Sequence, residues 1–140
     1  MRLVLDTNVV ASAMLWGGSP QRLLQARREK RIELFTSVAM LAELTDILSR
    51  PKFEKKIAAS QLTVDQLVDG YAALTQVVRP TPTPRIVADP DDDVVIGTAL
   101  AARADLLVTG DQTLLRVARH ANVRIVSVTV AIGITATAAG

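Results

Sequence analysis

The feature that most constrains how this chain folds is a short, mainly apolar run that ends at an acidic residue and occurs twice. Met1–Leu5 leads directly into Asp6, and Leu106–Val108 leads through a Thr-Gly step into Asp111. Short apolar runs beside turn-forming residues predict buried β-strands. In an open α/β sheet, ligands bind in the crevice beyond the carboxyl ends of the strands. The sequence therefore predicts an α/β domain in which two strands carry carboxylates to one edge of the sheet.

Asp6 has a simpler alternative role. Thr7–Leu15 is predicted to form a helix, and aspartate is one of the preferred residues for capping the start of a helix. The second strand that ends at an acid favours a functional site. Apolar periodicity and breaking residues predict further strands at 32–35, 86–88 and 124–128, and further helices at 20–30, 53–59, 63–75 and 112–119.

A third acid, Glu43, lies in the segment with the clearest helical periodicity, 37–48. Met40, Leu44 and Ile47 recur there at helical spacing. Glu43 borders this apolar stripe instead of facing open water. Since burying a carboxylate without a partner costs several kcal/mol, Glu43 is expected to have a cation or a hydrogen-bond donor beside it.

The run Asp89-Pro90-Asp91-Asp92-Asp93 contains four acids in five residues and precedes a helix expected over 93–103. The positive N-terminal end of a helix stabilises an acid by roughly 0.3–1 kcal/mol, which accounts for one or two of the four. The others repel one another unless a cation or a basic group is present. This run is therefore expected to contribute to a site as well as to a cap.

The acids that capping does not explain are Asp6, Glu43, Asp93 or its neighbour Asp92, and Asp111. A parallel sheet can bring them into one crevice, where a divalent cation relieves their repulsion. Neither histidine nor cysteine joins the set, so an all-oxygen shell favours Mg²⁺ or Mn²⁺ over Zn²⁺. Mg²⁺ is usually held by a few carboxylates plus phosphate oxygens, so the substrate is expected to carry phosphate. Such a site lowers the pKa of a bound water and orients it toward a phosphodiester.

The positions of these residues suggest their roles. Asp6 and Asp111, on strand ends, are expected to hold the metal, while Glu43 and Asp93 would hold a second ion or act through water as a general base. Two polar side chains, Asn8 and Thr109, could hydrogen-bond the carboxylates or the water. An equally good alternative is that they form turns and helix caps.

Four segments together resemble the PIN-domain ribonucleases, and most of all the VapC-like toxins of toxin–antitoxin systems. They are Leu3-Val4-Leu5-Asp6-Thr7-Asn8, the helix with Glu43, the acidic run at 89–93 before an apolar helix, and Leu107-Val108-Thr109-Gly110-Asp111. The acids of the family fall on Asp6, Glu43, Asp93 and Asp111, with Asn8 and Thr109 as polar support. Asp92 competes with Asp93 for one place, and counting back from the last strand favours Asp93.

The resemblance implies a three-layer α/β/α sandwich with a central, mainly parallel sheet of about five strands. It implies a Mg²⁺- or Mn²⁺-dependent endoribonuclease that hydrolyses RNA phosphodiester bonds, the toxin of a type II pair, forming a homodimer and neutralised by a cognate antitoxin protein. Residues 1–128 would form this nuclease domain. The uncharged segment 129–140 is expected to be a poorly anchored tail without a helix.

Basic residues gather in two stretches, 22–31 and 50–56. Clusters of lysine and arginine favour phosphate backbones, and a solvated helix face is the simpler alternative. Arg27, Arg28 and Lys52 are weak candidates for RNA contacts.

Composition predicts a cytoplasmic protein without a membrane partner. The chain has no cysteine, which favours a reducing compartment. Asp6 and Asn8 interrupt the apolar start, so no signal peptide is expected, and no apolar stretch reaches the roughly 18 residues of a membrane span.

Two other functions are alternatives to a nuclease. One is a catalytically silent PIN-fold module that binds nucleic acid or a protein partner. The other is a receiver-type signalling domain, which also gathers acids around Mg²⁺. A receiver needs an acidic pair at its first strand and a late lysine, whereas this chain offers one acid there and no lysine after Lys56.

Overall fold

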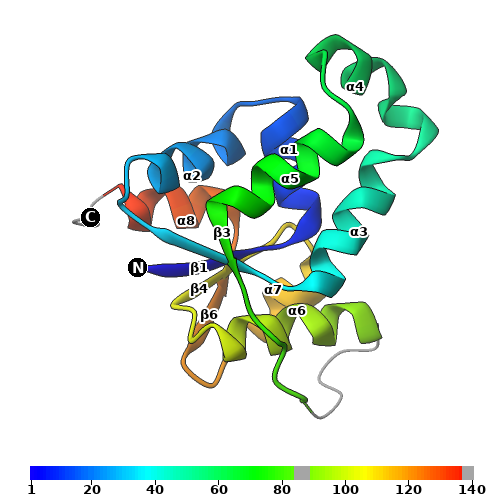
Figure 1. Cartoon of the computed structure of the whole chain (residues 1–140). Helices are drawn as coiled ribbons and strands as arrows, with labels where there is room; N and C mark the ends of the chain where they lie inside the picture. Colours follow the sequence, from blue (N-terminus) through cyan, green and yellow to red (C-terminus); the bar gives the residue numbers. More distant parts are fainter. Residues whose placement is uncertain (84–88, 137–140) are drawn as a thin grey trace.

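The computed structural model describes residues 1–83 and 89–136 and shows one sheet between two layers of helices (Figure 1). The strands are β1 (Arg2–Leu5), β2 (Glu33–Thr36), β3 (Thr75–Val77), β4 (Leu106–Val108), β5 (Arg119–His120) and β6 (Val123–Val126). They form a six-stranded sheet in the order β3-β2-β1-β4-β6-β5, in which only the β5–β6 pair is antiparallel. The predicted mainly parallel sheet is confirmed.

The helices are α1 (Thr7–Leu15), α2 (Ser19–Arg28), α3 (Val38–Leu48), α4 (Glu54–Ser60), α5 (Val64–Leu74), α6 (Pro90–Ala101), α7 (Gln112–Val117) and α8 (Val128–Thr135), with a 3₁₀ turn, η1 (Pro51–Phe53), before α4. The predicted bounds of α1 are confirmed. Helix α6 begins at Pro90 instead of Asp93, because the Asp89 side chain caps it by accepting from the Asp91 backbone N–H at 2.9 Å.

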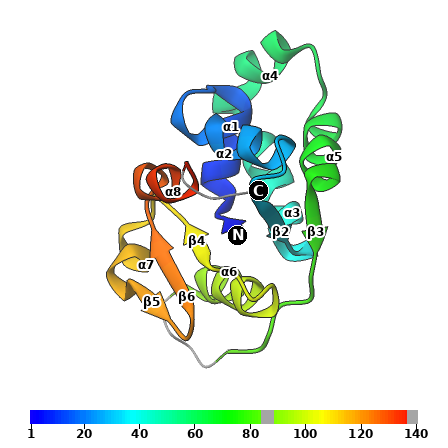
Figure 2. The ribbon, with the colours of Figure 1, turned by 90° about the vertical axis from the view of Figure 1, so that its left-hand side faces the viewer.

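Two separate cores, one on each face of the sheet, make the molecule three layers thick, as predicted. Leu3 and Leu5 of β1 pack with α1, α2, α3, α5 and α8, whereas Val4 packs with α6 and α7. Residues alternate between the two faces of a strand, so both faces of the central strands are apolar. Figure 2 shows α6 and α4 at opposite ends of the molecule.

The prediction of a poorly anchored tail is wrong for residues 129–136. Ser127 caps α8 by accepting from the Val130 N–H at 3.2 Å, and Ala131 of this helix is completely buried against the core. The Arg31 guanidinium also donates to the Thr135 carbonyl at 3.0 Å. Apolar packing and one long-range hydrogen bond therefore hold this segment on α2.

Two short strands, β3 and β5, were not predicted. The periodicity placed Thr75 in the preceding helix, whereas it begins β3, pairing with Leu34 of β2. The strand predicted at 86–88 lies outside the described residues. None of the helices in residues 1–83 and 89–136 has the length and apolar character needed to cross a bilayer.

Candidate active site

Asp6 follows the last residue of β1 and is both a helix cap and part of an acidic cluster. Its Oδ1 accepts hydrogen bonds from the Thr7 N–H at 2.8 Å and the Thr7 hydroxyl at 3.4 Å. Its Oδ2 accepts from the Thr109 hydroxyl at 2.7 Å, while its own N–H donates to the Val108 carbonyl at 2.9 Å. The residue is only 7% exposed. These contacts fix the carboxylate at the carboxyl edge of the sheet.

Thr109 ties the ends of neighbouring strands together. It is fully buried, and its hydroxyl, besides donating to Asp6, accepts from the Asp111 N–H at 3.0 Å. Its N–H donates to the Val126 carbonyl at 3.0 Å, which extends the pairing of β4 with β6. Asp111 in turn caps α7 by accepting from the Thr113 N–H at 2.7 Å. Thr109 therefore sets the positions of both strand-end acids.

Asp92, in the first turn of α6, is coupled to both of those acids. Its pKa is raised to about 6, first by burial, then by the charges of Asp111, Asp89 and Asp6, and by a side-chain hydrogen bond with Asp111. Asp93 is half-buried at the next position. The charges of Asp6 and Asp111 therefore act on Asp92 from the ends of two neighbouring strands.

Glu43 extends the cluster from α3. Burial raises its pKa first, a hydrogen bond with the Thr7 side chain opposes this, and the charges of Asp6, Asp91 and Asp89 raise it further. The predicted hydrogen-bond donor beside Glu43 is thus Thr7, which lies in the Asp-Thr-Asn segment but was not singled out from the sequence.

The remaining sequence candidates lie in other surroundings. Asn8 is exposed in the first turn of α1. The Arg27 guanidinium donates to the Leu74 carbonyl at 2.8 Å, which links α2 to the end of α5. Arg28 is exposed on α2, and the Lys52 ammonium lies 5.0 Å from the Phe53 ring centroid.

Comparison with known proteins places the chain in a family. A family model described as PIN domain matches residues 2–126. The chain belongs to the PIN-domain family. No curated protein matches this PIN domain.

Among solved structures, the PIN domain is similar to a chain of VapBC2 from Rickettsia felis bound to a DNA fragment from their promoter. The TM-score is 0.63 at 18% identity, over 91% of this chain and 98% of the other. At 18% identity, this similarity supports the assignment of the fold alone.

The acids of this PIN domain are close but not preassembled around an ion. Within residues 1–83 and 89–136, no three acidic side chains already stand together in a group that could hold a metal ion. The hydrogen bond between the Asp92 and Asp111 carboxyl groups requires that one of them carry a proton. That proton reduces the repulsion between the two acids, as a bound cation would. The donors at this edge are carboxylate and hydroxyl oxygens, which suit Mg²⁺ or Mn²⁺. The acids at this edge that could hold such an ion are Asp6, Asp111 and either Asp92 or Asp93.

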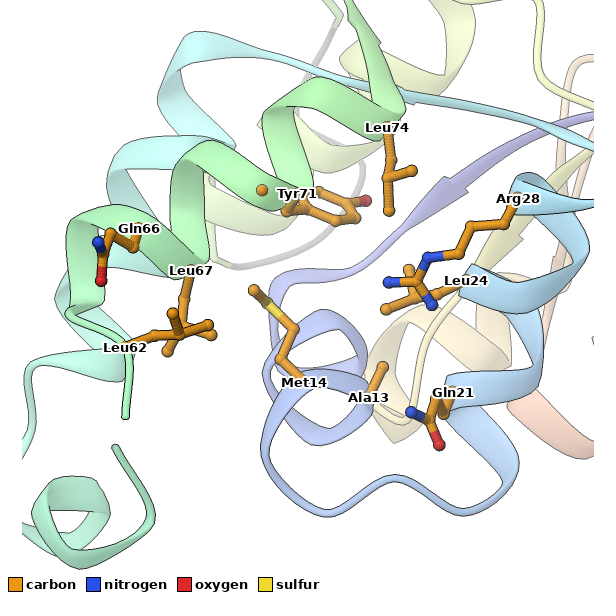
Figure 3. Close-up of a pocket in the computed structure, with 11 residues that line it drawn as sticks. Ala13, Met14, Gln21, Leu24, Arg28, Leu62, Gln66, Leu67, Tyr71 and Leu74 are labelled. Atoms are coloured by element: carbon orange, nitrogen blue, oxygen red, sulfur yellow. The ribbon is translucent and has the colours of Figure 1, made fainter. Parts of the chain in front are cut away.

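A separate cavity of about 230 Å³ lies between α1, α2 and α5. In Figure 3, Tyr71 and Leu74 line it from α5, Leu24 and Arg28 from α2, and Met14 from α1. The Tyr71 hydroxyl is buried without a hydrogen-bond partner in the described structure, and burial raises its pKa. No acid lines this cavity. The acidic edge of the sheet is therefore the better candidate for chemistry on a phosphodiester.

Proposed function

We propose that this PIN domain is a divalent-metal-dependent endoribonuclease and the toxin of a type II toxin–antitoxin pair. The observation that carries the proposal is the coupling of acids from distant parts of the chain at one sheet edge. Asp6 raises the pKa of both Glu43 and Asp92, although these residues lie on different helices. Membership of the PIN-domain family supports nuclease chemistry at this edge.

Asp6, Asp92 and Asp111 are the proposed metal ligands, with Asp93 as the alternative to Asp92. When bound, the ion would neutralise charge on the phosphodiester and lower the pKa of an attacking water. Thr109 orients Asp6 and Asp111 through its two hydrogen bonds. Glu43, whose pKa is raised, is proposed to accept a proton at its carboxylate as general base.

A cognate antitoxin is the proposed protein partner. The similar Rickettsia felis structure is of VapBC2 bound to a DNA fragment from their promoter, and its matched chain is covered almost completely by this one. That likeness supports a partner protein for this chain as well. A homodimer, and action on RNA in the cytoplasm, are parts of the same proposal.

One observation favours a second candidate, a catalytically silent PIN-fold binding module. In the described part of the chain the acids do not form a ready group of three. A silent module would keep the fold and the hydrogen bonds of Asp6 but would not cleave RNA. A receiver-type domain is less well supported, because β1 ends at a single acid.

Cleavage of labelled single-stranded RNA, with Mn²⁺ or with EDTA, tests the proposal. We expect cleavage with Mn²⁺ only, and Asp6→Asn should lower its rate more than about 100-fold because it removes a metal ligand. Asp69→Asn, which alters an exposed acid on α5, is the matched control and should cleave normally. Folding of each variant is checked by circular dichroism. A folded wild-type protein that never cleaves RNA would favour the silent module, and phosphorylation by acetyl phosphate would favour the receiver.

A further inference from the structure

Two aromatic rings and two lysines form a cluster at the C-terminal end of α1. Trp16, the C-cap residue of α1, is 52% exposed, and its ring centroid lies 5.4 Å from that of Phe53 at an angle of 74°. The Lys56 ammonium lies 5.5 Å from the Trp16 centroid, and the Lys52 ammonium lies 5.0 Å from the Phe53 centroid. We call these four residues the aromatic–lysine platform.

The platform carries unbalanced positive charge. Lys52 and Lys56, together with the neighbouring Lys55, are exposed. In the described ranges none of these three lysines takes part in a salt bridge, whereas Arg50 is paired with Asp46 at 3.5 Å. Only Glu54 is acidic between positions 50 and 56. An anionic partner would therefore find ammonium groups that have no acidic partner beside an exposed aromatic ring.

This combination of groups fits single-stranded RNA better than a protein. Proteins that bind single strands place aromatic rings for base stacking within a positively charged surface. The buried centres of protein–protein interfaces are instead depleted of lysine. Two other large exposed apolar side chains, Val77 and Val130, lie on β3 and α8.

The platform and the acidic edge lie at opposite ends of one helix. Asp6 caps the start of α1, and Trp16 caps its end. At 1.5 Å per residue, ten residues of helix span on the order of 15 Å, a length that a few nucleotides can cover. In both views α1 rises from the end of β1 toward α4 (Figures 1 and 2).

We propose that the aromatic–lysine platform binds single-stranded RNA, with one base stacked on Trp16 and phosphates on Lys52, Lys55 and Lys56. This inference rests on the proposed function, since it names how the RNA substrate is held.

Trp16 is the single tryptophan of the chain and reports directly on stacking. Its fluorescence is followed while single-stranded RNA is titrated into the full-length protein in EDTA, so that cleavage does not contribute. We expect saturable quenching that weakens with salt. Inorganic polyphosphate, which has charge but no bases, should compete for the lysines without the same quenching. Unchanged fluorescence with bound RNA, or equal quenching by polyphosphate, would overturn the proposal, as would a change that depends only on protein concentration, which would indicate an interface between copies.

Variants separate stacking from charge, with affinity measured by the anisotropy of labelled RNA at fixed salt. Trp16→Ala should weaken binding roughly 5- to 100-fold, the range expected when one base–aromatic stack is lost. Trp16→Phe should retain most of the affinity, and Val130→Ala on α8 should retain all of it. Equal affinity of Trp16→Ala and wild type would contradict the platform. Binding without cleavage in Mn²⁺ would reject only the proposed function, whereas cleavage without binding at Trp16 would reject only the platform.

Discussion

The two ends of α1 differ in burial and in charge. At its start, Asp6 is buried, accepts three hydrogen bonds and is surrounded by other acids. At its end, Trp16 is exposed and Lys56 lies over its ring. The helix dipole favours acids at the start of a helix and bases at its end by roughly 0.3–1 kcal/mol per charge. An effect of this size explains only part of either cluster.

This difference indicates what each end can bind. Crowded carboxylates at a strand edge lower their repulsion by taking up a proton or a small cation. Exposed lysines around a ring, which carry unbalanced positive charge, suit an extended polyanion. One helix would therefore link a metal-binding end to an RNA-binding end.

The largest effect should come from an acid of the proposed metal site at the start of α1. We expect Asp92→Asn to lower Mn²⁺-dependent RNA cleavage more than about 100-fold, because it removes a proposed ligand, and Asp93→Asn to lower it less than about tenfold. Initial rates under single-turnover conditions measure both variants. The reverse order would assign the ligand to Asp93.

A smaller effect is expected at the residue that joins the two strand ends. Thr109→Val keeps the shape of the side chain but removes the hydroxyl that contacts Asp6 and Asp111. We expect cleavage to fall about 10- to 100-fold. The free energy of unfolding should fall by about 1–3 kcal/mol. Thr129→Val, which alters an exposed threonine on α8, is the control. Normal cleavage by Thr109→Val would show that the Thr109 hydroxyl is not needed to position Asp6 and Asp111.

The raised pKa of Asp92 gives a pH effect that needs no substrate. The folded protein holds this proton up to about pH 6, whereas the unfolded chain releases it near 3.8. The folded state therefore binds more protons in this window, and Asp92 should lower the stability of the metal-free protein as pH rises from about 4 to about 6. In urea unfolding with EDTA, the free energy of unfolding of Asp92→Asn should rise relative to that of wild type as pH increases over this range. A difference between them that does not change with pH would contradict the coupling.

The smallest effect is expected at the aromatic–lysine platform. Lys55→Ala removes one exposed charge without touching either ring, so RNA affinity should fall only a few-fold. The slope of log affinity against log salt should become less negative by roughly 0.7. Arg119→Ala, an exposed cation on β5, is the control, and an equal change in slope there would indicate nonspecific charge effects.

Much of this arrangement follows from local sequence. The bounds of α1 and the strand-end positions of Asp6 and Asp111 were predictable, because short apolar runs and capping residues act over a few positions. The choice between Asp92 and Asp93 was not. Adjacent helical residues point roughly 100° apart, so the starting residue of α6 decides which acid faces the sheet edge.

Other features depended on contacts between distant segments. β3 is three residues long and is defined by its pairing with β2, not by a pattern of its own. Helix α8 is held by burial of Ala131 and by the contact from Arg31. The contact of Thr7 with Glu43 joins α1 to α3. The sequence pattern of neither segment predicts this contact.

Calorimetric titration of Mn²⁺ into the metal-free protein at pH 7 tests the central claim most directly. Wild type and Asp69→Asn should show saturable binding heat, and Asp6→Asn, with unchanged circular dichroism, should show none. Absence of binding by the folded wild-type protein, or equal binding by Asp6→Asn, would contradict a metal site at this edge of the sheet.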